Sequence, residues 1–197
     1  MKMRCIEIVS CCLTLSLAGG CQNKQGDVRD SVSVVSKMAT AAAKEDYIGG
    51  IAIGEDYLRE NPGDTTVLEQ TAVLTLAQAK RDQNNREPLV ARAALFLERS
   101  VKSGRPQEDN ADLFERFLAA RDFESAGDLS SDKCTYYRRA LALNSEVEVA
   151  LAGESLKSGD EKAASTKPLK EQSGRLQSEL EKRMSGSRCG KEPRGRP

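Results

Sequence analysis

Histidine and tryptophan do not occur in this 197-residue chain, and aromatic residues make up only 4% of it. Without an imidazole there is no Ser–His or Cys–His nucleophile pair, no histidine general base and no histidine-ligated metal. The scarcity of large aromatic side chains leaves Leu, Ala and Val to build the core. That composition suits helices that pack closely through small side chains.

Long hydrophobic runs and an excess of one charge are also missing. The clearest apolar stretch, residues 8–18, has eleven uncharged residues, whereas a helix needs about 20 to cross a bilayer. Thirty Lys and Arg residues balance thirty Asp and Glu residues. Composition therefore gives no reason to expect a nucleic-acid partner.

The motifs of an active site are absent as well. Gly49-Gly50 lacks the Lys and Ser or Thr of a phosphate-binding loop, and no Asp or Asn spacing matches a calcium loop. Adjacent carboxylates such as Glu45-Asp46 point in different directions on a helix. We expect no enzymatic activity, no catalytic residue, no cofactor and no metal.

The N-terminus has the layout of a secretory signal. Lys2 and Arg4 precede the apolar stretch, and residues 17–21 read LAGGC. This order resembles bacterial lipoprotein signal peptides, which implies cleavage before Cys21 and a lipid anchor on that cysteine. The family more often has leucine at the position of Ala18. Cleavage before Cys11 in place of Cys21 would leave almost no apolar stretch after Glu7. A simple cleaved signal and an uncleaved anchor are the alternatives.

The resemblance implies a location in the bacterial cell envelope. Gln22 follows the cysteine where inner-membrane lipoproteins tend to have Asp, so the outer membrane, facing the periplasm, is the expected site. Cys134 and Cys189 then remain as the two cysteines of the mature chain. An oxidising envelope favours a disulfide between them. The alternative, a buried Cys134 and a free Cys189 thiol, stays open.

Composition divides the chain into four parts: a signal peptide (1–20), a polar tether (21–31), a helical domain (32–160), and a helix followed by a flexible basic tail (161–197). Ala, Leu, Glu, Lys and Arg dominate the domain, while Gly, Pro and Asn-Asp clusters separate its helical runs. A thin apolar stripe over residues 168–184 predicts a further helix that packs loosely or stays disordered. The predicted helices of the domain cover residues 32–44, 46–60, 65–82, 88–103, 109–126, 131–143 and 146–157.

Three of these helices share a pattern of small, aromatic and aliphatic residues. Residues 46–60 end in the turn Asn61-Pro62-Gly63-Asp64, and residues 90–101 and 137–144 repeat parts of the pattern. They resemble the second helix of a tetratricopeptide repeat, although equivalent positions lie 43 and 40 residues apart and the family period is about 34. The resemblance implies an all-α fold of antiparallel helix pairs stacked as a short right-handed array with a partly disordered C-terminal tail. Residues 146–157 would be its final, unpaired helix, and an ordinary Ala/Leu-rich bundle is the alternative.

These features predict a membrane-tethered lipoprotein that binds an unidentified envelope protein or peptide, for example in envelope or secretion-complex assembly. Repeat arrays offer extended concave surfaces for such partners. The alternative is a structural or surface-binding lipoprotein whose Arg-rich tail contacts anionic glycan or lipid.

Overall fold

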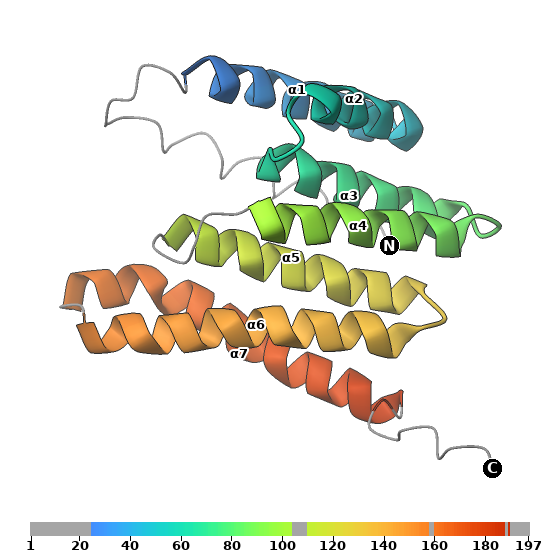
Figure 1. Cartoon of the computed structure of the whole chain (residues 1–197). Coiled ribbons are helices and arrows are strands. Elements are labelled where there is room, and N and C mark those ends of the chain that lie inside the picture. Colours follow the sequence, from blue (N-terminus) through green and yellow to red (C-terminus); the bar gives the residue numbers. More distant parts are fainter. Residues whose placement is uncertain (1–24, 104–109, 158–159, 188, 190–197) are drawn as a thin grey trace, which may run out of the picture.

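Seven helices and no strands make up the part of the chain that the computed structural model describes, namely residues 25–103, 110–157, 160–187 and 189 (Figure 1). This confirms the predicted all-α class. The helices are α1 (Gln25–Ala43), α2 (Tyr47–Glu60), α3 (Thr65–Arg81), α4 (Arg86–Ser103), α5 (Asn110–Leu129), α6 (Lys133–Lys157) and α7 (Asp160–Gly186).

Aspartate side chains at two turns mark where α2 and α3 begin. Asp46 caps α2 by accepting a 2.9 Å hydrogen bond from the backbone N–H of Gly49. Asp64 caps α3, accepting from Val67 N at 3.0 Å and from the Tyr57 hydroxyl at 3.0 Å. The predicted ends of these two helices are therefore correct to within one residue.

Consecutive helices pack as antiparallel neighbours, and the odd-numbered helices also approach one another (Figure 1). Backbone contacts within 8 Å join α1 to α3, α3 to α5 and α5 to α7. Across the described residues, α2, α4 and α6 make no such contacts with each other. The stack is therefore tighter on its odd-helix side than on its even-helix side.

Long side chains bridge the wider, even-helix side. Arg92 on α4 pairs with Glu55 on α2. Arg139 on α6 donates two hydrogen bonds to Glu98 on α4, from Nε to Oε1 at 2.6 Å and from Nη2 to Oε2 at 2.9 Å. These two Arg–Glu pairs link helices whose backbones do not touch.

Helix α6 corrects the prediction of separate helices at 131–143 and 146–157. The chain is helical without a break from Lys133 to Lys157, and Asn144 near its centre is fully buried. Its Nδ2 donates to the carbonyl oxygen of Ser173 at 3.1 Å and to Gln177 Oε1 at 3.2 Å. The polar side chain of Asn144 makes hydrogen bonds to α7, and α6 continues through this residue.

The final helix of the stack is α7, not residues 146–157. It starts at Asp160, eight residues before the predicted start, and includes Pro168 in its interior. Leu176 and Leu180 are buried against the stack, so the expectation of a loosely packed or disordered segment is wrong over the described part of α7. At the other end, α1 starts at Gln25, so residues 25–31 of the expected polar tether are helical. Residues 21–24 of the tether lie outside the described residues.

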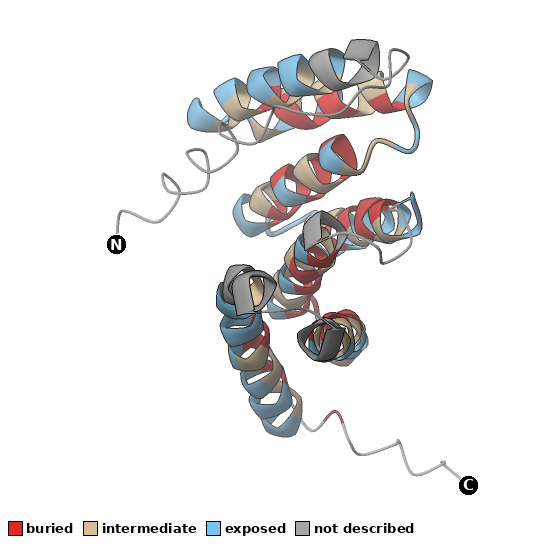
Figure 2. Ribbon diagram, turned by 90° about the vertical axis from the view of Figure 1, so that its left-hand side faces the viewer, coloured by how far each residue is buried: buried red, intermediate tan, exposed pale blue. Residues whose placement is uncertain are grey.

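The core runs through the stack along the facing sides of successive helices (Figure 2). One close helix contact is at Gly54 of α2, which lies between α1 and α3. A Cβ added there would come within 2.3 Å of Thr71 Oγ1 and 2.8 Å of Met38 Cε. Glycine thus permits a helix approach that any larger residue would obstruct.

Candidate binding surface

Each of the helices α1, α3 and α5 exposes one large hydrophobic side chain. Val32 is 64% exposed, Val73 39% and Phe114 47%. The spacing is regular, since 41 residues separate Val32 from Val73 and Val73 from Phe114. We call the exposed side of α1, α3 and α5 that carries these three residues the odd-helix face.

Buried residues repeat with the same spacing. Met38, Ala79 and Ala120 also lie 41 residues apart, and all three are fully buried. The same register therefore places one residue of each helix in the core and another in solvent. The exposed large hydrophobics of α2, α4 and α6, which are Ile48, Leu95 and Val149, do not share a constant spacing.

A group of carboxylates lies where α3 and α5 meet, beside the odd-helix face. Burial, together with the negative charges of Glu115 and Asp122, raises the pKa of Glu69 to about 8. The hydroxyl of Ser100 donates to Glu69 Oε1 over 3.4 Å and opposes part of this rise. We call Glu69, Glu115 and Asp122 the carboxylate group.

Asp122 has a similarly shifted titration. Burial raises its pKa to about 7, while the positive charges of Arg121 and Lys80 oppose the rise. These cations act on the Asp122 side of the carboxylate group, whereas the charges that act on Glu69 are negative. The neighbouring charges thus raise the pKa of Glu69 and lower that of Asp122, while burial keeps both pKa values above their usual range.

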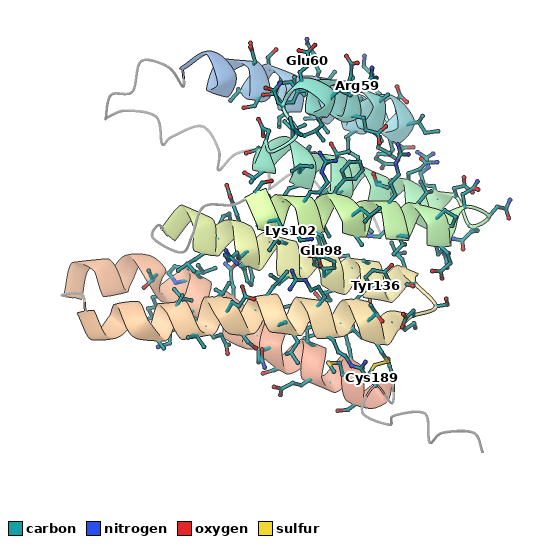
Figure 3. The ribbon with its side chains drawn as sticks, viewed as in Figure 1. Arg59, Glu60, Glu98, Lys102, Tyr136 and Cys189 are labelled. Atoms are coloured by element: carbon teal, nitrogen blue, oxygen red, sulfur yellow. A yellow bond between two sulfur atoms is a disulfide. The ribbon has the colours of Figure 1, made fainter. Side chains whose placement is uncertain are left out.

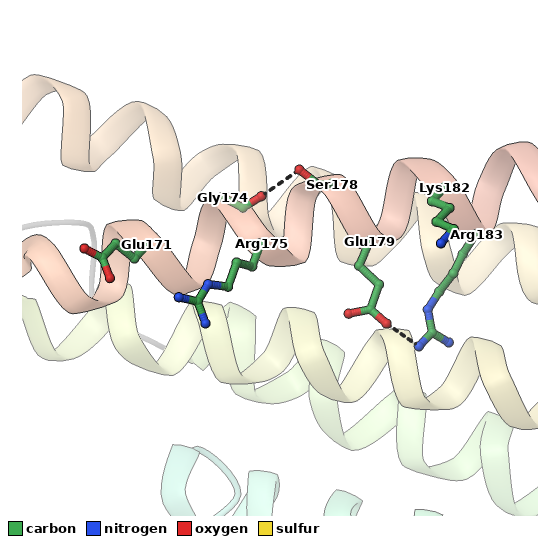
Figure 4. A pocket seen from close by; sticks show the side chains of 7 residues that line it. All are labelled: Glu171, Gly174, Arg175, Ser178, Glu179, Lys182 and Arg183. Carbon is green, nitrogen blue, oxygen red and sulfur yellow. Dashed lines mark hydrogen bonds and ion pairs between the residues drawn. The ribbon is translucent and has the colours of Figure 1, made fainter.

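A second feature is an open hollow of about 810 Å³ along α7, between Glu171 and Arg183 (Figure 4). Arg183 ties this helix to α5 by reaching Glu124 Oε1 at 3.1 Å, and it also pairs with Asp128 and Glu179. Partial burial raises the pKa of Glu124, and the charge of Arg183 opposes the rise. Carboxylates and cations alternate along the hollow, so its lining favours neither sign of ligand.

The structure brings Cys134 and Cys189 together as a disulfide, with an Sγ–Sγ distance of 2.15 Å and a Cα–Cα distance of 5.2 Å. Cys134 lies at the start of α6 and Cys189 follows α7 (Figure 3). The backbone N–H of Cys189 also donates to the carbonyl oxygen of Met184 at 2.9 Å. The bond thus fastens the C-terminal end of α7 to α6.

Cys21, the predicted lipidation site, lies outside the described residues, as does the basic tail over 190–197. In the described part of the chain, no three acidic or cysteine side chains gather in a way that could hold a metal ion. No helix in that part is long and apolar enough to cross a membrane.

Comparison with models of known protein families, with curated proteins and with solved structures finds no match. Function must therefore be inferred from the residues of this chain.

Two parts of this surface were not recognised from the sequence. The 41-residue spacing of Val32, Val73 and Phe114 is present in the sequence. It identifies equivalent positions only once the structure shows which residues of the odd helices are buried. In the sequence, Glu69 and Asp122 are two of many acidic residues in the helical segments. Their proximity depends on the packing of α3 against α5.

Proposed function

We propose that this protein is a lipid-anchored envelope scaffold whose odd-helix face binds a segment of another protein. The observation that carries this proposal is the asymmetry of the stack: in the described residues, each odd-numbered helix contacts the next odd-numbered helix, whereas the even-numbered helices do not contact one another. A stack that is tighter on one side curves toward that side, and such curvature makes the concave surfaces on which repeat proteins bind partners.

The proposed array is a tetratricopeptide-like, right-handed stack with α1–α2, α3–α4 and α5–α6 as its pairs and α7 as its terminal helix. The 41-residue register of the odd helices supports a repeated unit. Terminal helices of repeat arrays have a polar outer side, and α7 exposes Lys170, Glu171, Arg175 and Lys182.

The proposed anchor is a lipid on Cys21. Three residues separate Cys21 from the start of α1 at Gln25, and an extended chain of the resulting four residue-to-residue steps spans at most about 14 Å. The lipid would therefore hold the stack close to the membrane. The outer membrane, with the stack in the periplasm, is the proposed location.

Metabolic labelling with a palmitate analogue tests the anchor. The wild type should incorporate the label and fractionate with membranes, whereas Cys21→Ser should lose the label and its membrane association. Cys11→Ser is the matched control and should behave as the wild type. Label that persists in Cys21→Ser would contradict the assignment of Cys21.

A further inference from the structure

We propose that the Cys134–Cys189 disulfide is a redox-sensitive latch: exchange with a dithiol opens the bond and frees residues 181–189, at the C-terminal end of α7, from α5 and α6. The latch is independent of the proposed scaffold function, because it involves the terminal helix of the stack and no residue of the odd-helix face.

The two halves of α7 are held to the stack in different ways. Ser173, Leu176 and Leu180 are buried, and Ser173 exchanges hydrogen bonds with Asn144 of α6. Beyond Leu180, Cys189 is the only buried residue among those that the structure describes. Burial therefore keeps the chain docked as far as Leu180, and the covalent bond at Cys189 keeps it docked from there onward.

The other contacts of this end of α7 are polar and partly exposed. Arg183 pairs with Glu124 of α5, and its side chain is 31% exposed. Arg138 of α6 donates from Nη2 to the carbonyl oxygen of Cys189 at 2.5 Å. Ion pairs that remain in contact with solvent contribute little to stability. Without the disulfide, these contacts are too weak to hold this end of the helix against the stack.

The two sulfur atoms of the bond differ in access. Cys134 is partly exposed, whereas Cys189 is 3% exposed, so an incoming thiolate reaches Cys134. The thiolate bonds to Cys134 Sγ, the Sγ–Sγ bond breaks, and Cys189 leaves as a thiolate that takes up a proton. The second thiolate of the dithiol then attacks the first in the mixed disulfide and releases Cys134, which takes up the second proton. The dithiol is oxidised to a disulfide, and its two electrons reduce the protein's bond.

The position of Cys134 favours this exchange. Cys134 lies in the first turn of α6, which starts at Lys133, and Arg138 follows it by one helical turn. A helix N-terminus and nearby cations stabilise a thiolate, and a stabilised thiolate makes its disulfide easier to reduce. One carboxylate, Asp132, opposes the two cations, so the charges next to Cys134 in the sequence favour the thiolate on balance.

Opening the latch uncovers a junction of three helices at Tyr137. This residue of α6 is 3% exposed, and a Cβ added at Gly127 of α5 would come within 2.4 Å of its ring. Its hydroxyl donates to Asp128 of α5 at 2.7 Å and accepts from Arg183 of α7. Because Arg183 leaves with residues 181–189, the hydroxyl end of Tyr137 then faces solvent at the last helix pair of the stack.

The test is amide hydrogen exchange, read by mass spectrometry, on the purified full-length protein after its free thiols have been alkylated. Oxidised protein is compared with protein reduced by dithiothreitol without denaturant. We expect peptides that cover residues 181–189 to exchange about tenfold faster or more after reduction, while peptides from α2, α3 and α4 keep their rates. The Cys134→Ala, Cys189→Ala double variant should show the fast rate with or without dithiothreitol.

Glutathione, which has a single thiol, reports which sulfur is attacked. Peptide mapping after an acid quench should find the mixed disulfide on Cys134, and a mixed disulfide on Cys189 alone would contradict the proposed attack.

Three further results would overturn the latch. The bond could resist dithiothreitol in the native protein, or residues 181–189 could keep their slow exchange after reduction. Faster exchange throughout the stack would show that the bond stabilises the whole fold and not one end of α7.

Discussion

Asn144 of α6 and Ser173 of α7 exchange two hydrogen bonds in the interior of the protein. Ser173 Oγ donates to Asn144 Oδ1 at 2.9 Å, and Asn144 Nδ2 donates to the carbonyl oxygen of Ser173 at 3.1 Å. Both residues are fully buried. Buried polar groups satisfied in this way hold two helices in one register, since a shift of α7 would leave them without partners.

Replacing Asn144 by alanine should lower the free energy of unfolding by about 1–3 kcal/mol, because the Ser173 hydroxyl would then be buried without its acceptor. Urea denaturation of Asn144→Ala, Ser173→Ala and the double variant measures the coupling between the two residues. We expect the double variant to lose less than the sum of the single losses. Ser178→Ala, at an exposed position of α7, is the control, and strictly additive losses would refute the coupling.

Alanine at position 54 should destabilise the protein by about 1–3 kcal/mol, because its methyl group would overlap Thr71 and Met38 in the core. Gly153→Ala is the matched control, since Gly153 is also in a helix and a Cβ there meets nothing within 4 Å. That change should be neutral or stabilise the protein by up to about 1 kcal/mol. Thermal unfolding of both variants gives the comparison, and equal melting temperatures would contradict the close packing at Gly54.

Loss of the Cys134–Cys189 disulfide should lower the free energy of unfolding by about 2–4 kcal/mol, because the bond closes a sequence separation of 55 residues in the unfolded chain. The comparison is between wild type and a Cys134→Ala, Cys189→Ala double variant under oxidising conditions. Reducing agent should remove most of the difference between them. Non-reducing mass spectrometry that finds both thiols free in the native protein would exclude the bond.

The carboxylate group should make the protein less stable as the pH rises. The pKa of Glu69 is raised from 4.5 to about 8 and that of Asp122 from 3.8 to about 7, so the folded state holds these protons more tightly than the unfolded state. Their stabilising contribution is fully present below about pH 4 and is lost as the pH rises through about 7 to 8.

Urea midpoints measured from pH 5 to pH 9 test this dependence. Glu69→Gln should flatten the decline, because its amide does not ionise. Glu171→Gln, an exposed carboxylate on α7, should keep the wild-type slope. A wild-type slope in Glu69→Gln would show that Glu69 does not carry the effect.

Local chemistry made the helical class and the first helix boundaries predictable. In the turn Asn61-Pro62-Gly63-Asp64, Asn61 is the C-cap of α2 and Asp64 is the N-cap of α3. The end of α2 and the start of α3 therefore lie where the sequence predicts them. Asn144 was misread because its local context resembles a helix end. The Asn144 side chain accepts a hydrogen bond from Ser173, 29 residues later, and no local pattern could reveal that contact.

The binding surface was less predictable for a similar reason. The resemblance to repeat proteins suggested a surface formed by the stack but did not identify its residues. The row of Val32, Val73 and Phe114 follows from which side of each odd helix is buried. The raised pKa values of Glu69 and Asp122 follow from contacts between helices that are separated in sequence. Pairing of Cys134 with Cys189 was one of two alternatives until the fold placed α7 beside α6.

If the odd-helix face is where this protein binds its partner, as we propose, site-specific photo-crosslinking in intact cells should show it. A crosslinking amino acid is placed at position 73 on α3 and, as the matched control, at position 95 on α4, in the full-length lipid-anchored protein. We expect a reproducible adduct with an envelope protein from position 73, its loss when Phe114→Ser is added, and no adduct from position 95. An adduct from position 95 alone, or from neither position, would contradict it.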